Sequence, residues 1–216
     1  MTGYDTTGPL SARMAIHQYG TNPVRWYDFV RALLPPGRVL EAGAGTGALW
    51  ADDRPDGLVV SDLSPVMCVT LRDAGLTTVR AAADALPFRD RAFDGVVCNH
   101  VLYHLADPAA GVRELRRVAR DWVAVATNGY GHMAEVSAGG VHERFPAERL
   151  ADALGEQFTH VELHPYVDEL LVPSADPVVA YAESTGDTVD RAYVEAVIAR
   201  DGAYRVRKST VLALAR

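Results

Sequence analysis

The stretch RVLEAGAGTGAL, residues 38–49, most constrains what this chain can fold into. A short apolar run at 39–40 leads into Glu41 and then into three glycines at alternate positions, Gly43, Gly45 and Gly47. Residues 48–50 have helical character, so the pattern predicts a strand, a tight turn and a helix. Glycine suits positions where φ is positive or where a ligand lies against the backbone, and a helix start offers N–H donors. We therefore expect a small polar ligand at this turn.

Two classes of ligand bind at turns of this kind. Read as Gly43-x-Gly45-x-x-Ala48, the spacing matches dinucleotide sites, which place a pyrophosphate at the helix N-terminus. Read as Glu41-x-Gly43-x-Gly45-x-Gly47, it matches the turn that binds S-adenosylmethionine (SAM). Glu41 favours SAM, because a carboxylate attracts a ligand with an ammonium and a sulfonium and repels a pyrophosphate. A glycine turn that binds no ligand is the structural alternative.

Composition limits the classes of protein and partner. A chain of 216 residues with 49% apolar and 23% charged residues suits one sizeable α/β domain. Its formal charge of −7 argues against a nucleic-acid partner, which requires clustered Lys and Arg. Neither a signal sequence nor a membrane-length apolar run is apparent, so we expect a cytoplasmic protein that does not bind membranes. Cys68 and Cys98 lack metal-type spacing, so we expect free thiols.

Strands and helices alternate along the chain. Helix starts are predicted where a capping residue precedes proline, at Asn22-Pro23, Ser64-Pro65, Asp107-Pro108 and Asp176-Pro177. Short apolar runs between them predict strands at 58–60, 77–80, 93–98 and 122–126. Other segments predict helices at 11–19, 146–154 and 187–199, the last as core packing, and a strand at 158–163. This alternation predicts a doubly wound parallel sheet, whose ligands bind at the carboxyl ends of the strands.

Polar residues follow these strands where a ligand would bind. Asp62, after the second strand, can accept hydrogen bonds from both hydroxyls of a ribose, or it can cap the helix that starts at Ser64. Asp84, after the third strand, can accept from an adenine amino group. Asn99 and His100 directly follow the fourth strand.

Taken together, these segments resemble the class I SAM-dependent methyltransferases, in the small stand-alone bacterial form with a type 11-like domain. The segments occur in the family's order and spacing over residues 37–127, as EAGAGTG, SDLSP, ADALPF, FDGVV, YHLADP and RELRRVAR. The resemblance implies a Rossmann-like, mostly parallel sheet of seven strands, with residues 205–215 as an antiparallel last strand at its edge. It also implies a helical lid at residues 1–36 and a SAM-binding domain at 37–216, together forming a single domain.

The resemblance assigns a part of SAM to each candidate residue. The methionine part falls to the residues of the turn, Glu41, Gly43, Gly45 and Gly47. The adenosine part falls to residues after the second and third strands, Asp62 at the ribose, Leu63 on one adenine face, and Asp84 with Ala85 at the adenine edge. The remaining two assignments are Asn99 near the sulfonium and Tyr19 over the methionine carboxylate.

Methyl transfer is an in-line displacement, so alignment of nucleophile, methyl and sulfur supplies much of the catalysis. A base is needed only where the acceptor loses a proton, as a hydroxyl or a ring carbon does. His100 and His132 follow the fourth and fifth strands and are the candidate bases, with orienting or packing roles as the alternative. His100 and His104 have a metal-type spacing, but without a third ligand we expect no metal.

The substrate half of the sequence is less specific. The motif TNGYGHM, residues 127–133, also resembles a subgroup of the family, and a substrate cover is expected at about 128–146. The cover is shortened at SAGG, so it is either reduced or completed by a second subunit in a homodimer. We predict a SAM-dependent methyltransferase acting on a small molecule, such as a secondary metabolite. The alternatives are a non-catalytic SAM-binding protein and an enzyme that uses SAM for other chemistry.

Overall fold

The computed structural model describes residues 8–137 and 144–216 of the chain. These residues divide into two compact units. Unit 1 comprises residues 8–23, 131–137 and 166–209, and unit 2 comprises residues 24–130, 144–165 and 210–216. Residues 24–36 therefore group with unit 2, whereas the sequence placed all of 1–36 in a lid. The expected lid and single domain stay predictions.

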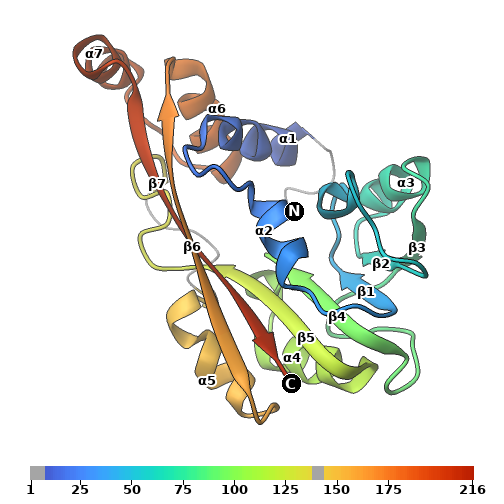
Figure 1. The fold of residues 1–216 in the computed structure, drawn as a ribbon. Coiled ribbons are helices and arrows are strands. Elements are labelled where there is room, and N and C mark those ends of the chain that lie inside the picture. Colours follow the sequence, from blue (N-terminus) through green and yellow to red (C-terminus); the bar gives the residue numbers. More distant parts are fainter. Residues whose placement is uncertain (1–7, 138–143) are drawn as a thin grey trace. The chain divides into compact units, whose positions relative to one another are not determined.

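Seven strands form one sheet with the order β3-β2-β1-β4-β5-β7-β6 (Figure 1). In chain order they are β1 (Val39–Ala42), β2 (Val59–Asp62), β3 (Thr77–Arg80), β4 (Phe93–Asn99), β5 (Ala119–Asn128), β6 (Val161–Val172) and β7 (Tyr204–Ala215). The first five are parallel to one another, and β7 runs antiparallel to β5. This confirms the predicted fold class. The edge position predicted for the last strand was wrong, because β7 lies beside β5 and β6 takes the edge.

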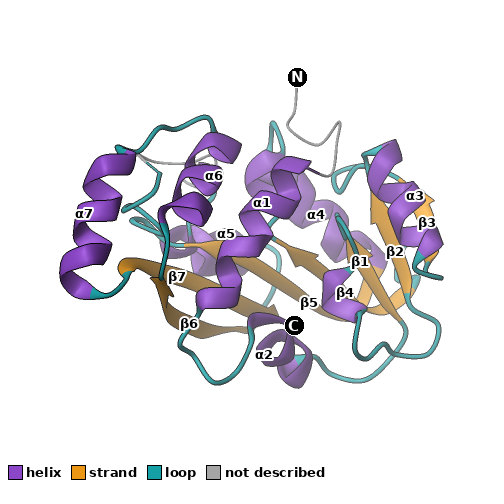
Figure 2. Cartoon of the chain, turned by 90° about the horizontal axis from the view of Figure 1, so that it is seen from above, coloured by secondary structure: helices purple, strands orange, loops and turns teal. Residues whose placement is uncertain are grey.

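Helices cover both faces of the parallel strands in unit 2. One face packs against α2 (Trp26–Leu33), the 3-10 turn η2 (Ala48–Trp50) and α3 (Pro65–Asp73). The other packs against α4 (Pro108–Val118) and α5 (Leu150–Gly155), the latter preceded by the 3-10 turn η5 (Ala147–Arg149). Successive side chains of a strand point to opposite faces, so Val39 belongs to the first core and Leu40 to the second. Figure 2 shows α3 running alongside β2 and β3.

Two of the four predicted helix caps are confirmed. The Ser64 hydroxyl accepts a hydrogen bond from Met67 N, and the Asp107 carboxylate accepts one from Ala109 N. The cap predicted at Asn22 was wrong, because its side chain donates to Val167 O and α2 begins only at Trp26.

The fourth predicted cap, at Asp176-Pro177, was also wrong. Helix α6 (Ala175–Thr185) starts after Ser174, so both residues lie inside its first turn. The strand predicted at 158–163 is displaced as well, since β6 begins at Val161 and continues to Val172. The strand therefore continues well past residue 163, where the alternating pattern used for the prediction ended.

Unit 1 contains α1 (Gly8–Ala15), the 3-10 turn η1 (Ile16–Tyr19), α6 and α7 (Arg191–Asp201). Their shared core contains buried apolar side chains from all parts of the unit, including Ile16, Met133, Leu170, Val178 and Val206. The predicted helix at 187–199 corresponds to α7, whose side-chain cap is Asp190. Its expected role in core packing is only partly met, since Val194 is its one fully buried residue. Among the described residues, no helix is both long and apolar enough to cross a bilayer.

Candidate functional site

The glycine turn joins β1 to η2 at the carboxyl edge of the sheet. Its three glycines all have positive φ, 77° at Gly43, 57° at Gly45 and 78° at Gly47. Space is also limiting, because a Cβ at Gly43 would lie 2.4 Å from Cγ2 of Val101. A side chain at Gly43 would therefore meet both backbone strain and a steric clash. The predicted strand and turn are confirmed, and the helix that follows is a single 3-10 turn.

Most N–H groups of this turn donate hydrogen bonds to other groups of the protein. These donors are the N–H groups of Gly43, Ala44, Gly45 and Gly47. The sequence predicted free N–H donors at a helix start, and for these groups that prediction was wrong. The turn therefore offers a ligand close access to the backbone rather than a set of unpaired donors.

Asp62 links the glycine turn to the end of β2. Its Oδ2 accepts a hydrogen bond from Gly45 N at 2.9 Å, and its Oδ1 accepts one from Ser64 N at 2.8 Å. Each carboxylate oxygen accepts more than one hydrogen bond, so both keep capacity for ribose hydroxyls. The neighbouring Leu63 is 61% exposed, which leaves an apolar surface available for an adenine ring.

Glu41 lies below the turn and is only 2% exposed. Its Oε2 accepts a hydrogen bond from Nε1 of Trp50 at 2.7 Å. Burial raises the pKa of Glu41 to about 8; the Trp50 hydrogen bond opposes the rise and the Asp62 charge adds to it. The sequence did not point to Trp50, although its position just after the glycines places it on the same face as Glu41.

The segment after β3 carries the predicted adenine-edge residues. Asp84 and Ala85 are exposed, and Ala85 N donates to Ala82 O at 3.1 Å in a tight turn. This segment is held by α4, because Glu114 accepts a hydrogen bond from Leu86 N at 2.7 Å.

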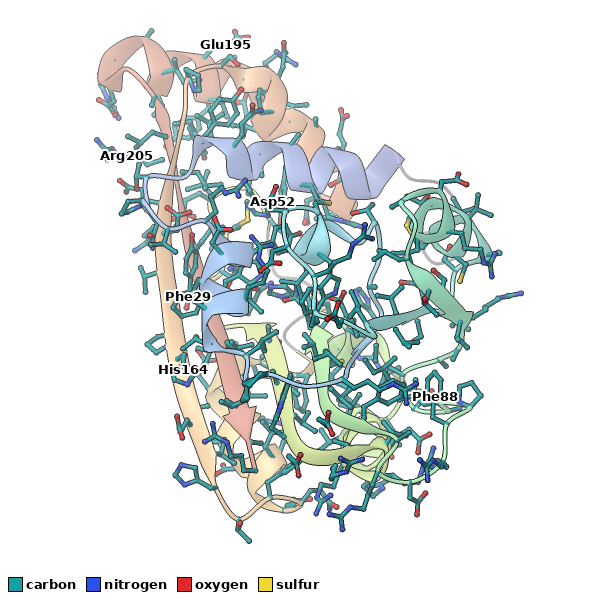
Figure 3. The ribbon with its side chains drawn as sticks, turned by 45° about the vertical axis from the view of Figure 1, so that its right-hand side comes forward. Phe29, Asp52, Phe88, His164, Glu195 and Arg205 are labelled. Carbon is teal, nitrogen blue, oxygen red and sulfur yellow. The ribbon has the colours of Figure 1, made fainter. Side chains whose placement is uncertain are left out.

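Arg117 completes this support. Its guanidinium donates to the carbonyl oxygens of Leu86 and Phe88 and forms an ion pair with Glu114. Phe88 is labelled in Figure 3. The sequence reasoning missed both α4 residues as supports. Their signal was an acid and a base three positions apart on a predicted helix, which indicates a pair but not what it binds.

Aromatic side chains surround His100 at the end of β4. His100 adopts φ of 61°, and its N–H donates to Ala126 O at 3.0 Å. Positive φ is uncommon for a residue other than glycine and is often found at functional sites. The His100 ring centroid lies 5.6 Å from that of Trp26 and 6.4 Å from that of Tyr103. Trp26 in turn stacks on Phe29, labelled in Figure 3.

Asn99 precedes His100 and is half-buried. Its Oδ1 is buried and has no hydrogen-bond partner among the described residues. An unsatisfied buried acceptor is costly, so a donor from a ligand would stabilise this position. That arrangement is compatible with the predicted place of Asn99 near the methyl-bearing end of SAM.

Two predicted site residues belong to unit 1. Tyr19 ends η1 and packs against the core of that unit. His132 is 7% exposed, and its Nδ1 lies 2.9 Å from Ser209 O and 3.1 Å from Ser209 N. This backbone contact favours the packing alternative for His132. Residues 138–143 of the predicted substrate cover lie outside the described part of the chain. Among the residues that the structure describes, no cluster of metal-ligating side chains occurs.

Comparison with known proteins identifies the domain that contains the turn. Residues 40–123 match the family described as "Methyltransferase domain". These residues are therefore similar to a methyltransferase domain. The resemblance drawn from the sequence is thereby confirmed, and SAM is confirmed as the cofactor of this family. The glycine turn, Asp62, Asp84 and His100 all fall within the matched residues.

Similar proteins extend this result. The demethylmenaquinone methyltransferase of Roseiflexus castenholzii is 40% identical over 109 residues, which cover 44% of each chain. The chain thus spans less than half the length of that relative. A SAM-dependent methyltransferase of Thermotoga maritima, titled "possible histamine N-methyltransferase", shares the fold with a TM-score of 0.65 and 16% identity, covering 99% of this chain and 97% of that one. The [4+2]-cyclase SpnF also shares it, with a TM-score of 0.61 and 19% identity, covering 99% and 94%.

Proposed function

We propose that this chain is a methyltransferase that moves the methyl group of SAM to a small molecule with a flat ring. The observation that carries the proposal is the hydrogen bond from Gly45 N to Asp62 Oδ2. It couples the turn after β1 to the carboxylate at the end of β2, and these are the two elements that the methionine and ribose parts of SAM require. The relative named demethylmenaquinone methyltransferase supports methyl transfer as the reaction.

The residues of unit 2 fit SAM in chemistry. Glu41 offers a carboxyl toward the cationic methionine end, Asp62 accepts from ribose hydroxyls, and Leu63 offers an apolar surface to adenine. Bound SAM supplies an electrophilic methyl group on a sulfonium. The chain's own contribution is to hold the methyl donor and the acceptor in line and to keep water out.

The acceptor side is assigned to the aromatic side chains at the end of β4. Trp26, His100 and Tyr103 offer ring faces and edges, which pack well against a flat aromatic acceptor. His100 is the group of this set that can accept a proton near neutral pH. We assign it the role of base where the acceptor loses a proton, and of orienting group where it does not.

Asp62→Asn is expected to weaken SAM binding by about tenfold to a hundredfold. Asparagine keeps the shape of the side chain but loses the charge, and a hydrogen bond to a charged group contributes about 1.5–3 kcal/mol. Calorimetric titration with SAM, S-adenosylhomocysteine and NAD measures the change. Asp73→Asn, an exposed change at the end of α3, is the matched control and should bind like the wild type. Unchanged SAM affinity in Asp62→Asn, or preference for NAD, would refute the assignment.

His100→Asn is expected to lower kcat by about a hundredfold while leaving SAM affinity unchanged, if His100 is the base. Asparagine tolerates the positive φ of this position better than most residues, so the backbone is preserved. His104→Asn, four positions further along the chain and exposed, serves as the control. The rate is measured by transfer of label from methyl-labelled SAM to the acceptor. A kcat equal to that of the wild type would assign His100 an orienting or packing role.

Chemistry other than methyl transfer is the second candidate. A protein titled as a [4+2]-cyclase shares this fold, and a fold does not by itself decide the reaction. Conversion of an acceptor without label transfer from SAM would favour this candidate. SAM binding without any conversion would favour a non-catalytic role.

A homodimer that completes the substrate cover stays a prediction, as does location in the cytoplasm.

A further inference from the structure

Glu41 is a buried acid without a cationic partner. Its side chain is 2% exposed, and Nε1 of Trp50 is its one hydrogen-bond donor among the described side chains. Within residues 8–137 and 144–216, none of the ion pairs includes Glu41. A buried carboxylate with so little compensation is costly, and such a group usually takes up a proton instead.

The titratable groups that face Glu41 do not relieve this cost. They are Tyr27 of α2, Asp62 of β2 and Cys98 of β4, none of which is a cation. Burial, and secondarily the charge of Glu41, raise the pKa of Tyr27 to about 12 and also raise that of the Cys98 thiol. Both groups therefore stay neutral at physiological pH. Burial keeps the pKa of Glu41 itself at about 8, so the carboxyl is mostly protonated at pH 7.

We propose that Glu41 is neutral in the free protein and releases its proton to solvent when the cationic methionine end of SAM binds. The O–H bond of the carboxyl breaks, the proton passes to the buffer, and the resulting carboxylate balances the positive charge of the ligand. Trp50 is the positioning residue, because its N–H holds Oε2 in both states. This inference rests on the proposed SAM site and adds proton release to it.

The sign of the pH dependence follows from this exchange. Below pH 8 the free carboxyl must first lose its proton. SAM affinity should therefore fall about tenfold for each unit by which the pH is lowered, until Glu41 also takes up a proton in the complex. Above that pH the carboxylate is already formed, and Glu41 adds no further pH dependence. A ligand that lacks the ammonium and the sulfonium, such as methylthioadenosine, should show no such dependence.

Calorimetric titration at pH 7 in two buffers of different ionisation enthalpy measures the protons released. The wild-type protein should release about one proton for each SAM bound and close to none for each methylthioadenosine. Glu41→Gln keeps an acceptor for Trp50 and should release close to none with SAM. Glu156→Gln, at an exposed position after α5, is the matched control and should behave like the wild type.

A second variant tests the role of Trp50 separately. Trp50→Phe removes the one donor to Oε2, so the free carboxyl holds its proton more tightly and the pH profile of SAM affinity should move to higher pH. An unmoved profile would contradict the positioning role, and this variant also serves if Glu41→Gln does not fold. SAM binding without proton release, or equal release by Glu41→Gln, would overturn the inference alone. Absence of SAM binding by the wild type would overturn the proposed function as well.

Discussion

Asp168→Ala is expected to lower the free energy of unfolding by about 3–5 kcal/mol, because it removes one partner from a buried charged network. Asp168 is 7% exposed and lies on β6 in unit 1. Its Oδ1 accepts from Thr21 N and Asn22 N, both at 2.9 Å, and its Oδ2 lies 3.6 Å from Nζ of Lys208. Alanine would leave two backbone donors and a buried ammonium without their acceptor. The same change should raise hydrogen exchange at Thr21 and Asn22.

Two further variants separate this effect from simple loss of a charge. Lys208→Met should cost less than Asp168→Ala, since Asp168 keeps its two backbone donors and burial already lowers the pKa of Lys208. Asp176→Ala removes an exposed partner of Arg191 and should cost less than about 1 kcal/mol. Denaturant-induced unfolding measures all three. An equal cost for Asp168→Ala and Asp176→Ala would show that the buried network contributes nothing.

Gly95→Ala is expected to destabilise unit 2 by about 3 kcal/mol, as overpacking of a buried site does. Gly95 of β4 lies opposite Trp122 of β5, whose indole is 3% exposed. A Cβ at Gly95 would lie 1.9 Å from Cε2 of that ring, closer than any real contact. Both residues belong to parallel strands inside the sheet, so neither the ring nor the strand can move without breaking other contacts.

The control for this change is Gly155→Ala, at the end of α5. No atom lies within 4 Å of the Cβ position there, so the change should be neutral or stabilising by about 0.5 kcal/mol. Adding Trp122→Leu to Gly95→Ala should recover part of the loss, because the smaller side chain leaves room for the methyl group. Thermal unfolding of the single and double variants gives the coupling. Additive losses would mean that the indole is not what excludes a side chain at Gly95.

Features with a local physical cause were predictable from the sequence. The glycine turn followed from spacing alone, because positive φ at alternate positions restricts the residue type. The caps at Ser64 and Asp107 followed from side chains that reach their own helix within three residues. The place of Asp62 at the end of a buried strand followed from the alternation of apolar runs. These signals need only neighbours along the chain.

Features that depend on distant partners were not predictable. Asn22 is of a residue type that often caps helices. Its side chain donates instead to the carbonyl oxygen of Val167, and its backbone N–H donates to Asp168, both far along the chain. The last strand alternates like an edge strand, but strand order depends on which partner it finds, and β7 pairs with β5. The support of the adenine loop by Glu114 and Arg117 likewise requires α4 to dock beside that loop.

Glu41 shows where local chemistry ends and tertiary structure begins. Its residue type and its place before the glycines already favoured a cationic ligand over a pyrophosphate. Its charge state depends on burial, on Trp50 as its donor and on the lack of a cation among the described residues near it. The amino-acid sequence specifies which chemical groups lie at the carboxyl edge of the sheet. Only the packed structure sets how much water each group keeps, and desolvation decides whether such a group carries a charge.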